Sequence, residues 1–381
     1  MEFGWTLEQK GAYERMVQSV KERINPLSAQ RSDSSRWSLQ EWRECAALGF
    51  LGLCVPEKYG GRGLDALHSA HLIEALGRSC DDMGLVFSVC VHLLACAMPL
   101  AEHGSEELRQ ALLPRLCAGE LVGAHAITED DAGSDAFCLK TKAVRDGAEY
   151  VVTGTKSWVT NGPLADVIII YASTSPQDGY LGVSTFAIDG RAPGVIVEPS
   201  FDKIGVRTTP SCAIRLDNCR VPASRLLGAE GEGSKAFQRC MLWERSCLFA
   251  LYLGVMERQL DDALAYARKR RQFGKAIGRN QAVSHRIVDM KLRLESARLL
   301  LYRACWRFDR GEDVTADVAL AKLAVSEAAV ASGLDSIRIH GGLGVRADRD
   351  VEHGLRDAVP SLILSGTSEL QREIIARAMG L

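Results

Sequence analysis

One acidic residue stands in a run of apolar residues and has the chemistry of a proton acceptor. Glu244 lies in the segment 241–249, which is otherwise rich in Met, Leu, Trp and Phe. Partial desolvation raises the proton affinity of a carboxylate, which suits the removal of a weakly acidic proton from carbon. The alternative is a structural glutamate that pairs with Arg245 or faces solvent. The local sequence alone favours this structural interpretation, so the surroundings of Glu244 in the fold have to decide its role.

The histidines and cysteines do not form a recognisable hydrolytic or metal-binding pattern. His92, His125, His285, His340 and His353 lie outside any H-E-x-x-H constellation, and the chain has no G-x-S-x-G elbow. The twelve cysteines show no C-x-x-C spacing, so we interpret most of them as small buried hydrophobes in a reducing compartment. We therefore expect no metal ion, and neither a hydrolase nor a metalloenzyme.

Composition narrows the possible partners and the location. The 381 residues carry a formal net charge of −2, which gives no basic surface for nucleic acid or for an anionic membrane. The first residues lead directly into polar helical sequence, without the pattern of a targeting signal. The apolar segment 83–100 contains His92 and Pro99 within helical sequence, so we predict a buried core helix and no membrane span. The expected location is cytoplasmic.

The hydrophobic periodicity changes twice along the chain and predicts an α+β fold of three modules. Residues 1–122 have helical spacing, residues 123–232 have short β-type runs separated by turn signals, and residues 233–381 return to helical spacing. The expected strands are 149–154, 167–171, 183–188, 195–198 and 212–216. The expected C-terminal helices are 234–271, 280–309, 316–340 and one that begins at Ser368. This order predicts an N-terminal helical domain, a small central β-barrel or sandwich, and a C-terminal four-helix bundle.

Four sequence blocks carry a resemblance to a known family. They are Ala-Ile-Thr-Glu-Asp-Asp-Ala-Gly-Ser-Asp at 126–135, Lys-Ser-Trp-Val-Thr-Asn-Gly at 156–162, Arg-Arg-Gln-Phe-Gly-Lys at 270–275, and Gly-Thr-Ser-Glu at 366–369. In this order, and across the expected change from helices to strands and back, they resemble the acyl-CoA dehydrogenases over essentially the whole chain. Members of that family take a proton from the α-carbon of a thioester while a hydride leaves the β-position for FAD. The resemblance therefore implies an FAD-dependent oxidoreductase.

The first two blocks are the part that the resemblance assigns to the flavin. An isoalloxazine needs a flat packing partner and a few short hydrogen-bond donors along its polar edge. By resemblance, Thr128 and its neighbours meet the pyrimidine edge, and Ser134 approaches the pyrophosphate. Trp158 packs against the ring, and Thr160 bonds near its reactive nitrogen. Without the resemblance, the simpler interpretation is that Thr128 and Thr160 are ordinary strand residues and that Trp158 belongs to the hydrophobic core. The further implied contacts are Ala126, Gly133, Thr367 and Glu369.

A second group of residues is implied to bind the far end of FAD. The matching positions are Arg270, Phe273, Gln281, Arg338, Gly341 and Gly342. In the family, Arg270 and Phe273 would reach the adenosine-pyrophosphate of a cofactor bound by a neighbouring subunit, and the glycines would let the backbone come close. A basic helix end that complements the helix dipole is the simpler interpretation of 270–275. Arg338 and His340 depart from the Gln and the aromatic residue usual in the family. A shared cofactor implies a homo-oligomer, and the family commonly forms homotetramers.

The resemblance also bears on the base. Most acyl-CoA dehydrogenases carry the catalytic carboxylate at the position of Ser365, whereas a minority carry it on a long helix at the position of Glu244. This chain has the second pattern, so we expect Glu244 to remove the α-proton. The enolate oxygen in the family is held by a flavin ribityl hydroxyl and by the backbone N–H at the position of Ser365. That N–H donor does not depend on the side chain.

Three segments bear on the substrate. Segments 243–249, 281–286 and 292–301 most resemble prolyl carrier-protein dehydrogenases of natural-product pathways. Those enzymes oxidise a prolyl group, tethered by phosphopantetheine to a peptidyl carrier protein, to pyrrolyl-2-carboxyl. Oxygen or an electron-transferring flavoprotein would accept the electrons. Acyl-CoA dehydrogenases of the isovaleryl type also use the helix position, so a short branched acyl-CoA remains an alternative substrate. A flavin-free helical assembly protein is the alternative of another class.

Overall fold

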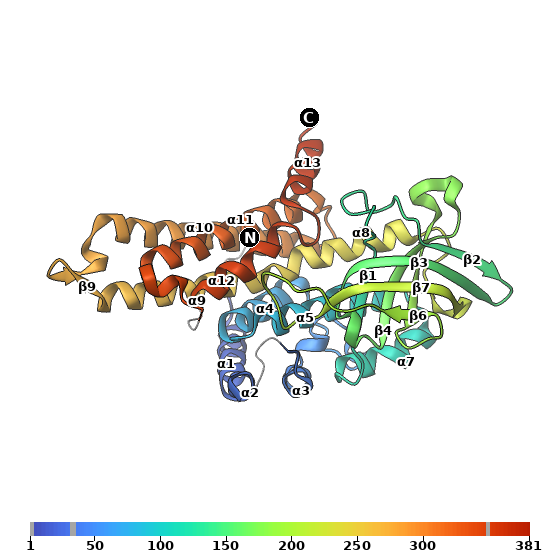
Figure 1. Ribbon diagram of the computed structural model, residues 1–381, viewed down its shortest axis with the longest axis horizontal. Helices are drawn as coiled ribbons and strands as arrows, with labels where there is room; N and C mark the ends of the chain where they lie inside the picture. Colours follow the sequence, from blue (N-terminus) through green and yellow to red (C-terminus); the bar gives the residue numbers. More distant parts are fainter. Residues whose placement is uncertain (1–3, 31–35, 348–350) are drawn as a thin grey trace.

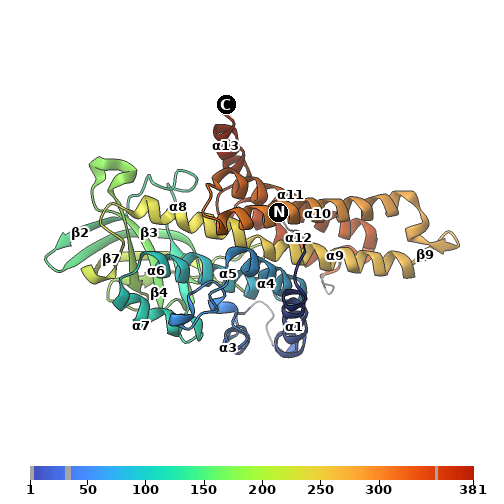
Figure 2. The same ribbon diagram turned by 180° about the vertical axis from the view of Figure 1, so that it is seen from behind.

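The structure is a computed structural model that describes residues 4–30, 36–347 and 351–381. The molecule is elongated, with a β-sheet at one end and a small β-hairpin at the opposite end (Figure 1). Long helices run between these two ends, and the view from behind shows the same arrangement (Figure 2). The α+β class predicted from the sequence is confirmed.

Helices form the first part of the chain. They are α1 (Leu7–Arg23), α2 (Asn25–Gln30), α3 (Leu39–Ala47), α4 (Ala66–Ser79), α5 (Met83–Val91), α6 (Met98–His103) and α7 (Glu106–Cys117). The side chains of Thr6, Ser38 and Asp65 each accept a backbone N–H of the first turn of α1, α3 and α4, respectively. Such caps satisfy donors that have no partner within the helix. The helical pattern of this region is therefore supported by local start signals.

The apolar segment at 83–100 is a buried core helix, as predicted. A π-helical turn, His92–Ala97, joins α5 to α6, so that Met83–His103 forms one continuous helix. By length and composition, it is the one helix among the described residues that would be able to cross a membrane. Its apolar stretch is entirely buried within the protein. Its hydrophobicity is thus accounted for by packing against the other helices and the sheet.

The central strands form one eight-stranded sheet. They are β1 (Gly123–Ala126), β2 (Lys142–Asp146), β3 (Glu149–Thr160), β4 (Val167–Ser173), β5 (Val183–Asp189), β6 (Val195–Val197), β7 (Ser211–Pro222) and β8 (Leu226–Leu227). The order is β6-β7-β3-β2-β4-β5-β8, and β1 pairs in parallel with β4. The five predicted strands correspond to β3 to β7, whereas β1, β2 and β8 were not predicted.

The two faces of the sheet bury different cores. Ile168 and Ile170 of β4 lie in a cluster formed by the sheet itself, together with Phe186 of β5. The alternate residues Ile169 and Tyr171 join the cluster of the helices. This alternation follows from the two-residue period of a strand. It fixes the sheet against the helices and so positions the ends of β1 and β3.

The C-terminal helices form the predicted bundle. They are α8 (Gly233–Trp243), α9 (Ala250–Lys269), α10 (Gln281–Asp309), α11 (Thr315–His340), α12 (Val351–Ala358) and α13 (Ser368–Ala378). The predicted helix 234–271 is wrong in two details. A π-helical turn, Glu244–Leu248, interrupts it, and it ends at Lys269, before the hairpin of β9 (Arg271–Gln272) and β10 (Lys275–Ala276). Helix α12 was not predicted.

The three predicted modules share a large core. The main cluster of buried apolar residues includes members of α5, β4, α9 and α11. The boundaries at 122/123 and 232/233 therefore stay a prediction. All twelve cysteines are free, and every one except Cys138 is buried, as expected for small hydrophobes.

Candidate active site

Glu244 opens the π-helical turn between α8 and α9. A π-helical turn inserts one extra residue into a helix, and such turns occur frequently at functional sites. The residues of α8 that precede Glu244 give it apolar surroundings, because Cys240 and Met241 are buried one turn before the glutamate. The glutamate is thereby carried on a rigid element instead of a loop.

Burial dominates the electrostatics of Glu244. Only 7% of the residue is exposed, and burial raises the pKa of its carboxyl above the ordinary value. The hydroxyl Oγ of Ser365 donates a hydrogen bond to Oε2 of Glu244, and this bond and the charge of Arg245 oppose the rise in pKa. The alternative in which Glu244 faces solvent is therefore wrong. The structure presents a partly desolvated carboxylate with one hydrogen-bond donor.

The loop that carries Ser365 has a strained backbone held from two sides. Ser365 has a positive φ of 53° and is followed by Gly366 at 93°. Arg245 is buried, and its Nε donates to the carbonyl oxygen of Ser365 at 3.0 Å. Nε2 of Gln371 donates to the carbonyl oxygen of Gly366, also at 3.0 Å. Within the described residues, the backbone N–H of Ser365 has no acceptor, so it is available to a ligand.

Trp158 lies at the end of β3 and is not a core residue. It is 59% exposed, with a positive φ of 57°. The register of β3 against β7 shifts between Lys156 and Val159, and such a bulge re-aims the side chain it carries. Phe201 supports one side of the indole, with ring centroids 4.6 Å apart. An exposed, supported aromatic surface suits the packing of a flat ligand.

A buried ion pair ties the two walls of the cleft together. Nζ of Lys156 lies 2.7 Å from Oε1 of Glu129 and also donates to the carbonyl oxygen of Ile127 at 3.1 Å. Glu129 further accepts the backbone N–H groups of Lys140 and Thr141. Burial lowers the pKa of Lys156 to about 8, against the opposing effect of Glu129. The pair joins the segments 126–135 and 156–162, and both residues lie in blocks whose sequence gave no sign of their pairing.

Next to Glu244 is a small cleft of about 100 Å³. It is lined by Phe87, Val91, His125, Ile127, Thr128, Ser157, Trp158, Thr160, Glu244, Leu248, Leu364 and Ser365. The structure thus brings together five of the predicted residues: Thr128, Trp158, Thr160, Glu244 and Ser365. Ala126 is buried at the end of β1, just before this cleft. Hydroxyl groups, an exposed indole and a buried carboxylate therefore face one space.

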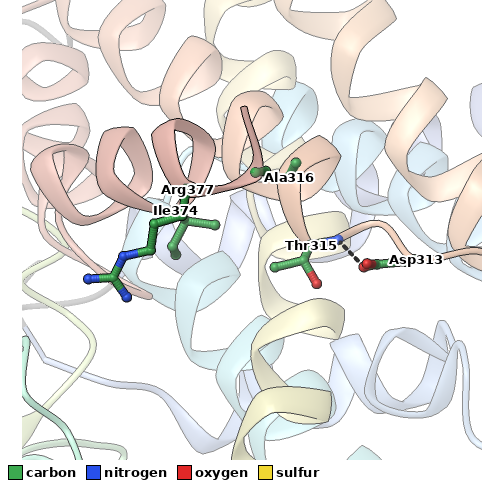
Figure 3. Close-up of a pocket in the computed structure, with 6 residues that line it drawn as sticks. Asp313, Thr315, Ala316, Ile374 and Arg377 are labelled. Carbon is green, nitrogen blue, oxygen red and sulfur yellow. Dashed lines mark hydrogen bonds between the residues drawn. The ribbon is translucent and has the colours of Figure 1, made fainter. Parts of the chain in front are cut away.

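A larger hollow, of about 460 Å³, lies between the start of α11 and the end of α13 (Figure 3). Asp313 accepts the backbone N–H of Thr315 there at 3.0 Å. Ile374 and Arg377 of α13 form its other side. It contains none of the predicted site residues, and its polar groups are those of a helix start and a solvated helix end. The smaller cleft at Glu244 carries the chemistry.

The other predicted cofactor residues do not line this cleft. Phe273 stands in the β9–β10 hairpin at the end of the molecule opposite the sheet (Figure 1) and is 96% exposed. The remaining exposed residues of this distal group are Arg270, Gln281, Arg338, Gly341 and Gly342. Gly133 and Ser134 lie in an exposed loop. Thr367 caps α13 through the N–H of Leu370, and Glu369 is exposed in the first turn of that helix.

Three models of one family together match most of the chain. Residues 6–120 match the N-terminal domain of acyl-CoA dehydrogenase, residues 124–219 the middle domain, and residues 231–380 the C-terminal domain. The protein belongs to the acyl-CoA dehydrogenase family. Within this family it is 47% identical, over the full length of both chains, to the L-prolyl-(peptidyl-carrier protein) dehydrogenase of Pseudomonas fluorescens. It is 43% identical to the enzyme of the same name from a Serratia species, covering 100% of this chain and 99% of that one.

Solved structures from the family agree with this relationship. The structure of PigA with FAD and proline superimposes with a TM-score of 0.98 at 43% identity, over the full length of both chains. The prolyl acyl carrier protein oxidase AnaB gives a TM-score of 0.95 at 39% identity, covering 99% of this chain and 100% of that one. The family fold predicted from the four sequence blocks is confirmed.

Three residues that line the cleft or directly follow a lining residue were not predicted as site residues. His125 was considered only as a competing acid–base residue and set aside, yet it lines the cleft with Glu244. Arg245 was considered as an ion-pair partner of Glu244, whereas its Nε bonds the Ser365 carbonyl. Asn161 has a positive φ of 63°, and its Nδ2 donates to the carbonyl oxygens of Ser88 and Gly123. In the sequence, His125 directly precedes the first matching block, Asn161 lies within the second, and Arg245 follows Glu244.

Proposed function

We propose that the protein oxidises a prolyl group, held as a thioester on the phosphopantetheine arm of a carrier protein, to pyrrolyl-2-carboxyl in an FAD-dependent reaction of natural-product biosynthesis. One observation carries the proposal. A buried carboxylate, Glu244, lies beside the Ser365 loop and an exposed indole, Trp158. The two full-length relatives named for the prolyl carrier-protein substrate support the choice of thioester.

Glu244 acts as the base that takes the α-proton. Its carboxylate lies in an apolar wall, where the raised pKa increases its affinity for a proton. The α-proton of a thioester becomes more acidic when its carbonyl oxygen is held by hydrogen bonds. The backbone N–H of Ser365 supplies one such bond. Arg245 and Gln371 hold the loop that carries this N–H by donating hydrogen bonds to the carbonyl oxygens of Ser365 and Gly366, respectively.

The residues around the cleft fit FAD. Trp158 offers a flat, supported surface, and the hydroxyls of Thr128 and Thr160 lie beside it in the cleft. When bound, FAD supplies a hydride acceptor next to the substrate carbon. Gly133 and Ser134 line an exposed loop, and a Cβ added to Gly133 would meet nothing within 4 Å. This loop therefore leaves room for a pyrophosphate. Ala126, Thr367 and Glu369 complete the near set.

A second subunit completes the cofactor site in this proposal. The β9–β10 hairpin, which includes Phe273, lies at the end of the molecule away from β3, the strand of Trp158 (Figures 1 and 2). A single chain does not bring both sets to one cofactor, so we propose a homo-oligomer, with four subunits as the expected number. Phe273 is almost fully exposed in the single chain, so its ring is accessible to a cofactor bound by a neighbouring subunit.

The whole conversion removes four hydrogen atoms, as two protons and two hydrides. A first α,β-dehydrogenation is followed by tautomerisation and a second two-electron oxidation, which aromatic stabilisation favours. The electrons pass from the flavin to oxygen or to an electron-transferring flavoprotein. Twelve free cysteines, eleven of them buried, are consistent with a cytoplasmic enzyme in a reducing compartment.

Intact-mass spectrometry tests the substrate directly. The purified yellow protein is incubated with a prolyl-loaded carrier protein and, separately, with a panel of short and branched acyl-CoAs. Loss of four hydrogen atoms from the prolyl arm, with the acyl-CoAs unchanged, is the expected result. Desaturation of isovaleryl-CoA with an unchanged prolyl arm would instead assign the protein to branched acyl-CoA oxidation. A colourless protein that does not take up FAD would contradict both the prolyl and the acyl-CoA functions.

A further inference from the structure

His125 has a place in the cleft that the reaction described above does not use. It lies on β1 and lines the same cleft as Glu244. Its Nε2 is 3.9 Å from Sγ of Cys240, and Cys240 precedes Glu244 by one helical turn, on the same face of the helix. The imidazole therefore stands beside the segment of α8 that presents the carboxylate.

The ring of His125 is held by aromatic neighbours from two elements. Phe237 of α8 is nearly parallel to it, with ring centroids 6.3 Å apart and planes at 14°. Tyr171 of β4 meets it edge-on, with centroids 5.2 Å apart. Phe237 and Tyr171 also contact each other at 5.7 Å. This packing restricts the imidazole to one orientation before any ligand binds, which lowers the entropic cost of recognition.

The imidazole is neutral. Burial, with a smaller effect from the charge of Lys156, lowers the pKa of His125 to about 4. A neutral imidazole has one N–H donor and one acceptor nitrogen. It can therefore accept a hydrogen bond from an amine without adding a positive charge next to Glu244.

A prolyl thioester brings one polar group that an acyl thioester lacks, the ring amine. The amine is bonded to the α-carbon, so it must lie close to Glu244 when the α-proton is taken. A charged amine there would pair with the carboxylate and lower its proton affinity. A neutral amine that is hydrogen-bonded to another side chain leaves the Glu244 carboxylate free to take the α-proton. Among the polar side chains that line the cleft, Thr128 and Thr160 are taken by the proposed flavin contacts, and Ser365 is bonded to Glu244.

We propose that His125 accepts a hydrogen bond from the ring N–H of the prolyl group and thereby selects a cyclic aminoacyl thioester over a plain acyl thioester. This inference rests on the proposed prolyl carrier-protein function and deepens it. Ser157 lines the cleft as well, but it directly precedes Trp158 on β3, next to the proposed flavin contacts. His125, in contrast, packs against Phe237 of α8, the helix that leads into Glu244. It is therefore the polar side chain whose position is fixed relative to the base.

Two substrates of the same shape separate the effect of the ring nitrogen. Carrier protein is loaded with a prolyl group or with a cyclopentanecarbonyl group, which replaces the N–H by CH₂. First-step desaturation is followed by intact mass for the wild-type protein and for His125→Phe, His125→Gln and Val91→Ala. Val91 is an apolar lining residue and serves as the control for a change in cleft shape. Flavin absorbance checks that every variant holds FAD.

The expected readout is the ratio of kcat/KM for the two substrates. Loss of one hydrogen bond to a buried amine costs about tenfold to a hundredfold, so the wild-type protein should prefer the prolyl group by about that factor. His125→Phe should bring the ratio close to one, His125→Gln should restore part of the preference, and Val91→Ala should slow both substrates without changing their ratio.

Two results would count against different statements. A wild-type protein that oxidises the prolyl group, combined with a His125→Phe variant that keeps the full preference, would overturn the role of His125 and leave the proposed function intact. A wild-type protein that leaves the prolyl group unchanged would overturn the function itself. If His125→Phe fails to fold or to bind FAD, the decision falls to His125→Gln and His125→Asn. A full wild-type preference for the prolyl group in both of these variants would reject recognition of the amine by His125.

Discussion

Replacing Glu244 by glutamine tests the assignment of the base most directly. The variant Glu244→Gln has nearly the same shape, and its amide oxygen can still accept the hydrogen bond from Ser365. What it loses is the proton-accepting carboxylate. Within the described residues that line the cleft, the other ionisable side chain is His125, whose pKa of about 4 makes it a weak base. No lining group therefore replaces the carboxylate.

The expected loss follows from the usual contribution of a positioned base. General base catalysis contributes about 10²- to 10⁴-fold, which corresponds to roughly 3 to 5.5 kcal/mol at 1.36 kcal/mol per factor of ten. We expect the loss to lie in the upper part of this range, because the α-proton is weakly acidic. Substrate binding should change much less than turnover, since the shape of the cleft is preserved.

The same variant makes a prediction for stability. The pKa of Glu244 is raised in the folded protein, so the protonated form favours folding, and this contribution is lost as the pH rises through the raised pKa. The neutral glutamine does not carry the cost of a buried charge. Glu244→Gln should therefore be at least as heat-stable as the wild type at pH 8. Its advantage in Tm should shrink toward acidic pH, where Glu244 is protonated.

Two measurements decide between this reasoning and its alternatives. Turnover of the prolyl carrier protein is followed by intact mass, and Tm is followed by thermal unfolding between pH 5 and 9, with flavin content as a check. Glu373→Gln, an exposed position on α13, is the matched control. Turnover within about threefold of the wild type would show that another base operates. A variant with a lower Tm at pH 8 would contradict the cost of burying the charge.

Three further changes probe the supports of the site. Lys156→Met leaves Glu129 buried without its cation, so the free energy of unfolding, measured by chemical denaturation, should fall by about 3 kcal/mol. Adding Glu129→Gln to the same chain should recover part of this lost stability. Trp158→Ala should weaken FAD binding about tenfold in a flavin fluorescence titration. The free energy of unfolding should change by less than about 1 kcal/mol, because the indole is exposed. Unchanged affinity for FAD would contradict the contact of Trp158 with the flavin ring. Phe273→Ala should reduce both flavin content and subunit assembly in sedimentation, whereas full retention of both would argue against a shared cofactor site.

Regular elements were predictable because their local signals agree. Helix α10 was expected at 280–309 and spans Gln281–Asp309, and α11 was expected at 316–340 and spans Thr315–His340. Both keep a helical apolar period without an internal proline, so pattern and propensity give the same answer. Helix α12 was missed because it is only eight residues long, too short for its period to be distinguished.

The strands show the same limit. β4 was recognised as an apolar run, and it is buried along its whole length. β1 spans only four residues, Gly-Ala-His-Ala, which have little strand character. Its position is set by parallel pairing with β4 and by His92, whose Nδ1 accepts the N–H of Gly123 at 2.9 Å. Such long-range contacts leave no local pattern to read.

The site was predictable only as a set of matching positions. Residues 243–253 around the π-helical turn are all buried. The shift caused by the extra residue therefore leaves no visible break in the apolar pattern, and one long helix was the natural expectation. The pair of Lys156 with Glu129 joins β3 to the segment that follows β1, and its two residues come from separate sequence blocks. The alignment of His125 with the cleft depends on packing between β1 and α8. These features are tertiary, and the sequence alone did not specify them.

The hydrogen bond between Ser365 and Glu244 joins residues that are 121 positions apart in the chain. A side chain from the helix and a side chain from the loop thus arrive at one point in space, next to the cleft proposed for the thioester. The reaction prescribes where a negative charge must stand, but it leaves open which segment of the polypeptide delivers it. An acid at either of the two positions would reach the same space, without any rebuilding of the pocket. Equivalent groups in such a fold are recognised by their location in the cleft and not by their position in the sequence.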